Sequence, residues 1–79
     1  MTKGDKYIKL VEWSDEDGCF IGSCPELFYG GCHGFDAKAV ISELCEIIDE
    51  TVALYESEGK ALPDPLSGRE FVNALQTIA

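Results

Sequence analysis

Apolar side chains recur with two different periods along this chain. Between residues 7 and 24, two short runs rich in aromatic and β-branched residues flank an acidic segment that ends in Asp17-Gly18. The runs predict strands over 7–13 and 19–24, because such side chains fit a pleated surface. The Asp-Gly dipeptide predicts a turn of four to five residues, since glycine accepts a positive φ without steric cost. We therefore expect a β-hairpin with an acidic tip.

Both faces of this hairpin carry apolar side chains. Val11 and Trp13 lie on the face opposite Leu10 in the first strand, and Phe20 opposes Ile21 in the second. A strand with one solvated face and one buried face alternates more regularly between polar and apolar residues. One helix covers one face of a small sheet, so a further element or molecule is expected on the other face, unless these are ordinary exposed apolar residues.

The second strand is expected to end at Pro25, which lacks a backbone N–H for the ladder. Residues 28–31, with two glycines, then predict a loop, and residues 32–35 predict a short third strand. Together with the hairpin, this return forms a three-stranded antiparallel meander. Its last strand contains the chain's one histidine, His33, which we expect to be half-buried.

From Asp36 onward the apolar period becomes helical. Asp36 is a good N-cap, because its carboxylate can accept the unpaired amides of the first turn. Phe35 and Val40 have the spacing of a hydrophobic staple, and Gly59 suits the position after the last turn. The pattern predicts a helix over 37–58, with apolar residues repeating at helical spacing on one side: Val40, Leu44, Ile47, Ile48, Thr51, Val52 and Tyr55.

The remaining residues predict a connector and a second, short helix. Residues 60–65 contain two prolines, and the following Ser67-Gly68-Arg69-Glu70 has the form of a capping box. We therefore divide the chain into a domain over 1–65 and a helical extension over 66–79. The predicted class is α+β, with two layers: a three-stranded antiparallel meander packed on one long helix, followed by a short C-terminal helix.

Size and charge limit the possible functions. A chain of 79 residues is near the lower limit for a self-sufficient core, and such domains often gain stability from another subunit. We therefore expect a homodimer or a higher homo-oligomer. The formal net charge of −9 disfavours binding to phosphate, so we expect no direct DNA binding. The acidity suits a basic protein partner, or it serves only to keep the chain in solution.

The four cysteines are expected to be reduced and buried. No apolar segment typical of a secretion signal follows Met1, and no run reaches membrane-spanning length. We therefore expect a cytoplasmic protein without a membrane partner, in which thiols stay reduced. The spacing from Cys24 to Cys32 and His33 lacks the C-x2-C pair of closely spaced cysteines that is typical of a zinc site.

None of the candidate catalytic groups in the sequence indicates an enzyme. Asp15, Glu16 and Asp17 are acids on a hairpin tip, where they splay into solvent instead of converging on a metal ion. His33 and Cys32 point to opposite faces if both lie in one strand, although Cys24 or Cys45 could approach the histidine. No glycine-rich phosphate loop is present. We expect a binding module with no catalytic residue, metal or cofactor.

Four blocks of this sequence resemble one known family. They are Val11 to Gly18, then Ser23-Cys24-Pro25-Glu26-Leu27, then Gly31-Cys32-His33-Gly34-Phe35-Asp36, and finally Glu58 to Pro65. In this order they are similar to HicB-family antitoxins, over about residues 6–65. The loop 28–31 departs from the family pattern, and residues 66–79 are too few for the DNA-binding module of full-length members.

The resemblance implies a partial ribonuclease-H-like fold without catalysis. It further implies binding to a small basic HicA-type toxin that cleaves mRNA, with occlusion of the toxin's RNA-cleaving surface. An RNA-binding or residual metal-dependent nuclease domain, and a structural homo-oligomer, remain alternatives. We expect the hairpin and the acidic helix face to form the contact surface for a partner: Trp13, Asp15, Asp17, Phe20, Glu43, Glu46 and Glu50.

Overall fold

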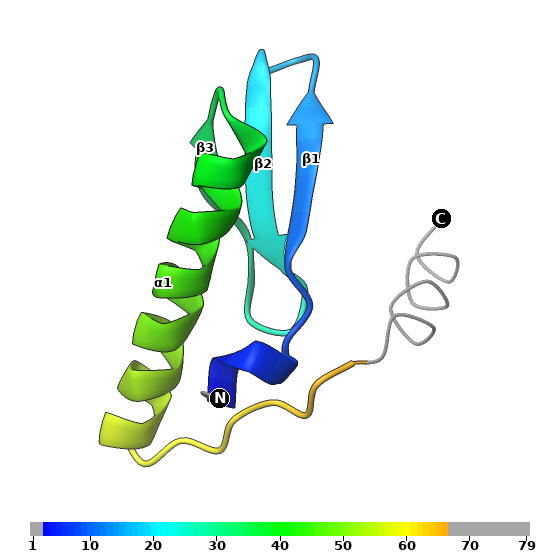
Figure 1. The fold of residues 1–79 in the computed structure, drawn as a ribbon. Coiled ribbons are helices and arrows are strands. Elements are labelled where there is room, and N and C mark those ends of the chain that lie inside the picture. Colours follow the sequence, from blue (N-terminus) through cyan, green and yellow to red (C-terminus); the bar gives the residue numbers. More distant parts are fainter. Residues whose placement is uncertain (1–2, 67–79) are drawn as a thin grey trace.

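Residues 3–66 fold as a sheet with one helix across it. The computed structural model describes residues 3–66, and the predicted C-terminal helix lies outside this range. The elements are a short 3-10 helix η1 (Lys3–Lys6), three strands and one α-helix, namely β1 (Leu10–Ser14), β2 (Cys19–Cys24), β3 (Phe28–Gly34) and α1 (Ala37–Ser57). The strands form an antiparallel sheet in the order β1-β2-β3, and α1 lies across one face of it (Figure 1). The predicted α+β class and meander are confirmed.

The β1–β2 hairpin has the predicted acidic tip. Trp13 lies opposite Phe20 and Ser14 opposite Cys19, which leaves residues 15–18 as the turn. The N–H of Gly18 donates to the carbonyl of Ser14 at 2.8 Å, and Gly18 has a φ of 66°. The strand before the turn is shorter than predicted, because the chain enters the sheet only at Leu10.

The third strand begins earlier than the sequence indicated. Residues 28–31 were predicted as a loop, but they belong to β3, with Phe28 opposite Cys24. The register shifts between Gly22 and Cys24, and Gly30 has a φ of 66°. The extra residues form an irregularity of the kind that glycine permits, and the N–H of Gly30 donates to Oγ of Ser23 at 2.9 Å.

The helix has the predicted ends. The side chain of Asp36 accepts a hydrogen bond from the N–H of Lys38 at 3.2 Å, and Gly59 has a φ of 70° after the last turn. The expected staple is wrong in one respect: Val40 is buried, but Phe35 leaves 86% of its surface exposed. Phe35 follows the strand on the connection to α1 and points away from the core.

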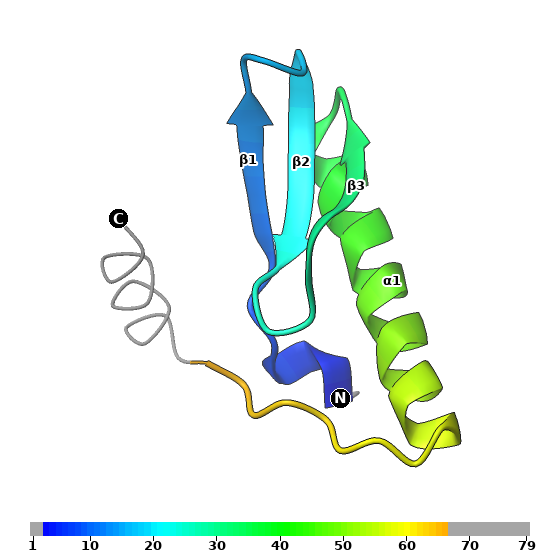
Figure 2. The same cartoon turned by 180° about the vertical axis from the view of Figure 1, so that it is seen from behind.

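The core lies between α1 and the covered face of the sheet. The helix buries Val40, Leu44, Ile48 and Val52 at the predicted spacing. Gly22 permits this close approach, since an added Cβ would come within 2.8 Å of the Cys32 sulfur and 3.1 Å of Val40. The opposite face of the sheet, hereafter the open face, carries no helix among the described residues (Figure 2).

The segments at both ends of the described chain meet beside the helix. Lys3–Lys6 forms η1 and contacts α1. Tyr7, which was predicted to lie in the first strand, is instead buried before β1. Its hydroxyl donates to the carbonyl of Pro63 at 2.6 Å. Residues 60–66, hereafter the C-terminal arm, thus run back along the end of the molecule that carries η1 (Figure 1).

Candidate functional site

A rigid aromatic pair marks the tip end of the hairpin. Trp13 and Phe20 face each other across the two strands, with ring centroids 5.1 Å apart and planes at 74°. This edge-to-face arrangement is the favoured one for two aromatic rings. Trp13 nevertheless keeps 51% of its surface exposed, whereas Phe20 is half-buried against the core. The register required by the turn brings the two predicted partner-binding aromatics into contact.

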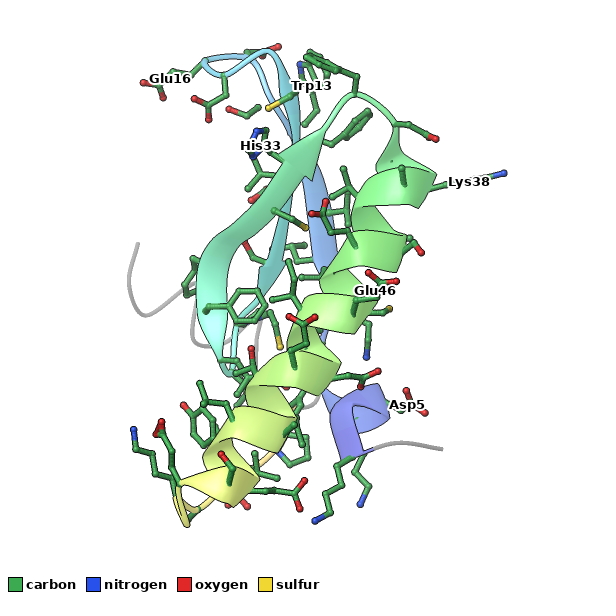
Figure 3. All side chains as sticks on the ribbon, turned by 90° about the vertical axis from the view of Figure 1, so that its left-hand side faces the viewer. Asp5, Trp13, Glu16, His33, Lys38 and Glu46 are labelled. Carbon is green, nitrogen blue, oxygen red and sulfur yellow. The ribbon has the colours of Figure 1, made fainter. Side chains whose placement is uncertain are left out.

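The acids of the tip make local hydrogen bonds. Nε1 of Trp13 donates to Oδ1 of Asp15 at 2.7 Å. The hydroxyl of Ser14 donates to Oδ2 of Asp17 at 3.0 Å and accepts from the N–H of Asp17 at 3.2 Å. Asp15, Glu16 and Asp17 are all exposed, and Glu16 points outward from the tip (Figure 3). The interpretation of these residues as solvated turn acids is confirmed.

The remaining predicted site residues form a separate surface. Glu43, Glu46 and Glu50, hereafter the acidic stripe, are exposed on α1 at helical spacing. Glu43 lies close enough to Cys32 of β3 for its charge to act on that thiol. Glu46 lies along the helix, far from Trp13 at the tip end (Figure 3). The structure therefore divides the predicted contact residues into the acidic stripe and a second set on the hairpin. This second set, hereafter the hairpin group, consists of Trp13, Asp15, Asp17 and Phe20.

The open face carries a small hollow near the tip. It has a volume of about 380 Å³ and is lined by Asp17, Cys19, Ile21 and His33. The expectation of a half-buried His33 is wrong, because this side chain is exposed. It lies on the side of the sheet away from the helix (Figure 3), opposite Cys32, which is buried against α1. Among residues 3–66, no three side chains of His, Cys, Asp or Glu are grouped closely enough to hold a metal ion.

Glu26 is a structural residue that sequence reasoning missed. Both of its carboxylate oxygens accept from the N–H of Ile8 at 3.2 Å, and Oε2 also accepts from the N–H of Leu66 at 2.9 Å. One side chain in the β2–β3 connection thus holds the segment before β1 and the C-terminal arm. We call this arrangement the Glu26 clasp. The sequence offered one signal for this role, namely a single acidic residue between Pro25 and Leu27 in an otherwise apolar segment.

The cysteines are buried small side chains, as predicted, apart from the half-buried Cys45. All four are free thiols. Cys24 is fully buried, and its sulfur lies 3.6 Å from Oε1 of Glu26, to which the thiol donates. Burial, followed by the negative charge of Glu26, raises the pKa of Cys24 to about 11. Burial, then the charge of Glu43, also raises the pKa of Cys32.

The raised pKa predicts that the Cys24 thiol reacts slowly with alkylating reagents. A pKa of about 11 instead of 9.0 lowers the thiolate fraction at pH 8 by about 100-fold. We expect iodoacetamide to alkylate Cys24 at least about 100-fold more slowly in the folded protein than in 8 M urea, as read by peptide mass spectrometry. Cys45 serves as the internal control and should show weaker protection. Equal rates at Cys24 in the two states would contradict its buried position.

Comparisons with known proteins identify no relative of this chain. No family model, curated protein or solved structure matches this chain. Among the described residues, no helix is both long enough and apolar enough to cross a membrane. The arrangement of the side chains themselves therefore carries the functional argument.

Proposed function

We propose that this chain is a non-enzymatic, HicB-like antitoxin that binds a small basic mRNA-cleaving toxin of HicA type and occludes its RNA-cleaving surface. The observation that carries this proposal is the half-exposed Trp13, held by Phe20 and placed beside an exposed carboxylate at the hairpin tip. Aromatic side chains that remain accessible on a rigid element are typical anchors of protein interfaces. The partial ribonuclease-H-like assignment and the cytoplasmic location belong to the same proposal.

Electrostatics would speed and orient the encounter. A chain with a formal net charge of −9 attracts a basic protein over a distance of about 8 Å at physiological salt. The hairpin group supplies an apolar anchor within this field, whereas the acidic stripe offers only exposed carboxylates. Exposed charge pairs contribute little affinity, so the hairpin group is the primary contact surface and the acidic stripe acts mainly on the association rate.

The uncovered sheet favours self-association alongside toxin binding. Leu10 and Ile21 lie on the face opposite Val11 and Gly22, and both are only half-buried. These side chains become more completely buried when a second copy covers this face, and a small domain gains stability in this way. We therefore include a homodimer or higher homo-oligomer in the proposal. Trp13 lies on the helix side of the sheet, so such an assembly leaves it accessible.

Co-expression with the basic protein encoded by a neighbouring gene tests the proposal. We expect the two chains to co-purify and this chain to restore growth of cells arrested by that toxin. Trp13→Ala should weaken binding by about 30-fold or more, as expected for a central aromatic anchor. Tyr29→Ala removes another exposed aromatic, on β3, and should have little effect. A chain that neither captures the toxin nor rescues growth would refute the antitoxin assignment.

A further inference from the structure

The indole of Trp13 combines an accessible aromatic surface with a fixed carboxylate. Its Nε1 donates to Oδ1 of Asp15 at 2.7 Å, and both residues lie on the same hairpin, two positions apart. Half of the Trp13 surface remains exposed. An indole is the best of the natural aromatic side chains for attracting a cation to its face. A carboxylate bonded to the ring edge adds a full negative charge at the same place.

Two contacts hold this ring before any partner arrives. Phe20 packs against it at a centroid distance of 5.1 Å and an angle of 74°, and the Asp15 bond fixes its edge. Phe20 itself is half-buried and packs against the core. The ring therefore loses little conformational freedom when a ligand stacks on it, and binding is stronger when the site is formed in advance.

We propose that Trp13 and Asp15 form a receptor for an arginine side chain of a protein partner. The guanidinium stacks on the exposed part of the indole and donates to the Asp15 carboxylate. A planar guanidinium suits both contacts at once, whereas the compact ammonium of lysine is more strongly hydrated and cannot stack. This inference rests on the proposed function in taking the partner to be basic, and it adds which side chain is recognised and where.

Exposed acids lie at the same end of the molecule as Trp13. Glu16 and Asp17 lie on the same exposed tip. The connection from β3 to α1, which carries the exposed Phe35 and Asp36, lies at the same end of the molecule as the tip (Figure 1). Trp13 and Phe35 thus each have a carboxylate within two positions in the sequence. At this end the exposed carboxylates outnumber the exposed Lys38 in the first turn of α1, which favours a partner that presents arginine.

Tryptophan fluorescence measures binding at this site directly, because Trp13 is the one tryptophan of the chain. We would titrate the full chain with a hexa-arginine peptide, and separately with a hexa-lysine peptide, at 150 mM salt, and follow tryptophan emission. We expect hexa-arginine to change the emission saturably and to bind about tenfold or more tightly than hexa-lysine, because only arginine both stacks and donates in a fork. Equal affinities for the two peptides would overturn the proposal.

A matched pair of variants separates this site from general attraction to an acidic protein. Asp15→Asn keeps an oxygen acceptor for the Trp13 N–H but removes the charge, and it should weaken hexa-arginine binding by about fivefold. Glu58→Gln removes one charge at the far end of α1, where Glu58 pairs with Lys60, and should change affinity less than twofold. Equal losses in both variants would overturn the proposal.

Failure of this site and failure of the antitoxin assignment give different results. If hexa-arginine binds as expected but no basic toxin is captured, the arginine receptor stands and the antitoxin assignment falls. If the toxin is captured equally well by the wild type and by Asp15→Asn, the antitoxin assignment stands and the arginine receptor is overturned.

Discussion

Replacing Leu44 with alanine is expected to unfold a large fraction of the protein at 25 °C. Leu44 is fully buried, and its side chain packs over Gly22, where an added Cβ would lie 3.5 Å from it. A buried Leu→Ala change costs about 3–5 kcal/mol, which includes the cavity left behind. A core in a domain of this size rarely supplies more than about 3–5 kcal/mol. The two quantities are similar, so little net stability should remain.

Urea unfolding followed by circular dichroism measures this effect. Leu54→Ala is the matched control, because Leu54 lies on the same helix but keeps 56% of its surface exposed. We expect Leu54→Ala to change the free energy of unfolding by less than about 1 kcal/mol, since most of that side chain is already in water. A Leu44→Ala variant that unfolds at nearly the wild-type urea concentration would show that this helix face is not the core.

The features that the sequence predicted well depend on local signals. Asp36 caps α1 because its carboxylate reaches an amide two residues away, and Gly59 ends the helix through its own φ. The hairpin follows from Asp17-Gly18, and its register then places Trp13 against Phe20. In each case the interacting groups lie within one turn or one short hairpin, where spacing determines geometry.

The features that the sequence did not predict depend on contacts between distant residues. Gly30 and Gly31 indicated a loop, yet they lie within β3, at a register shift with pairing to β2 on both sides and a positive φ at Gly30. Phe35 has staple spacing, but its orientation depends on the angle between strand and helix, which leaves it exposed. Tertiary pairing can override local preference in this way.

Part of the candidate site could be predicted, because the site lies mainly on one hairpin. Trp13, Asp15 and Phe20 were identified from their types and positions, and the structure places Trp13 in contact with the other two. The same reasoning also grouped the acidic stripe with them, because periodicity cannot tell where a helix face lies relative to a sheet. The orientation of α1 across the sheet separates the two surfaces (Figure 3).

Replacing Glu26 with glutamine is expected to release the C-terminal arm and lower stability by about 2–3 kcal/mol. The Glu26 carboxylate accepts from the N–H groups of Ile8 and Leu66, which are 18 and 40 residues away in the chain. Hydrogen bonds to a charged group contribute about 1.5–3 kcal/mol. A glutamine has one carbonyl oxygen, and its NH2 group would face a backbone N–H, so at least one donor loses its partner.

Native-state hydrogen exchange of the Ile8 and Leu66 amides measures the release directly, and urea unfolding gives the change in stability. Glu58→Gln is the matched control, because Glu58 also lies near the C-terminal arm but pairs with Lys60 at 2.9 Å on an exposed surface. Such a pair contributes about 0–1 kcal/mol, so its loss should leave both amides protected. Faster exchange at both amides in Glu26→Gln would mean that one carboxylate joins the two ends of the described chain to the sheet. Unchanged protection at Leu66 would mean that the Tyr7–Pro63 contact alone holds the C-terminal arm.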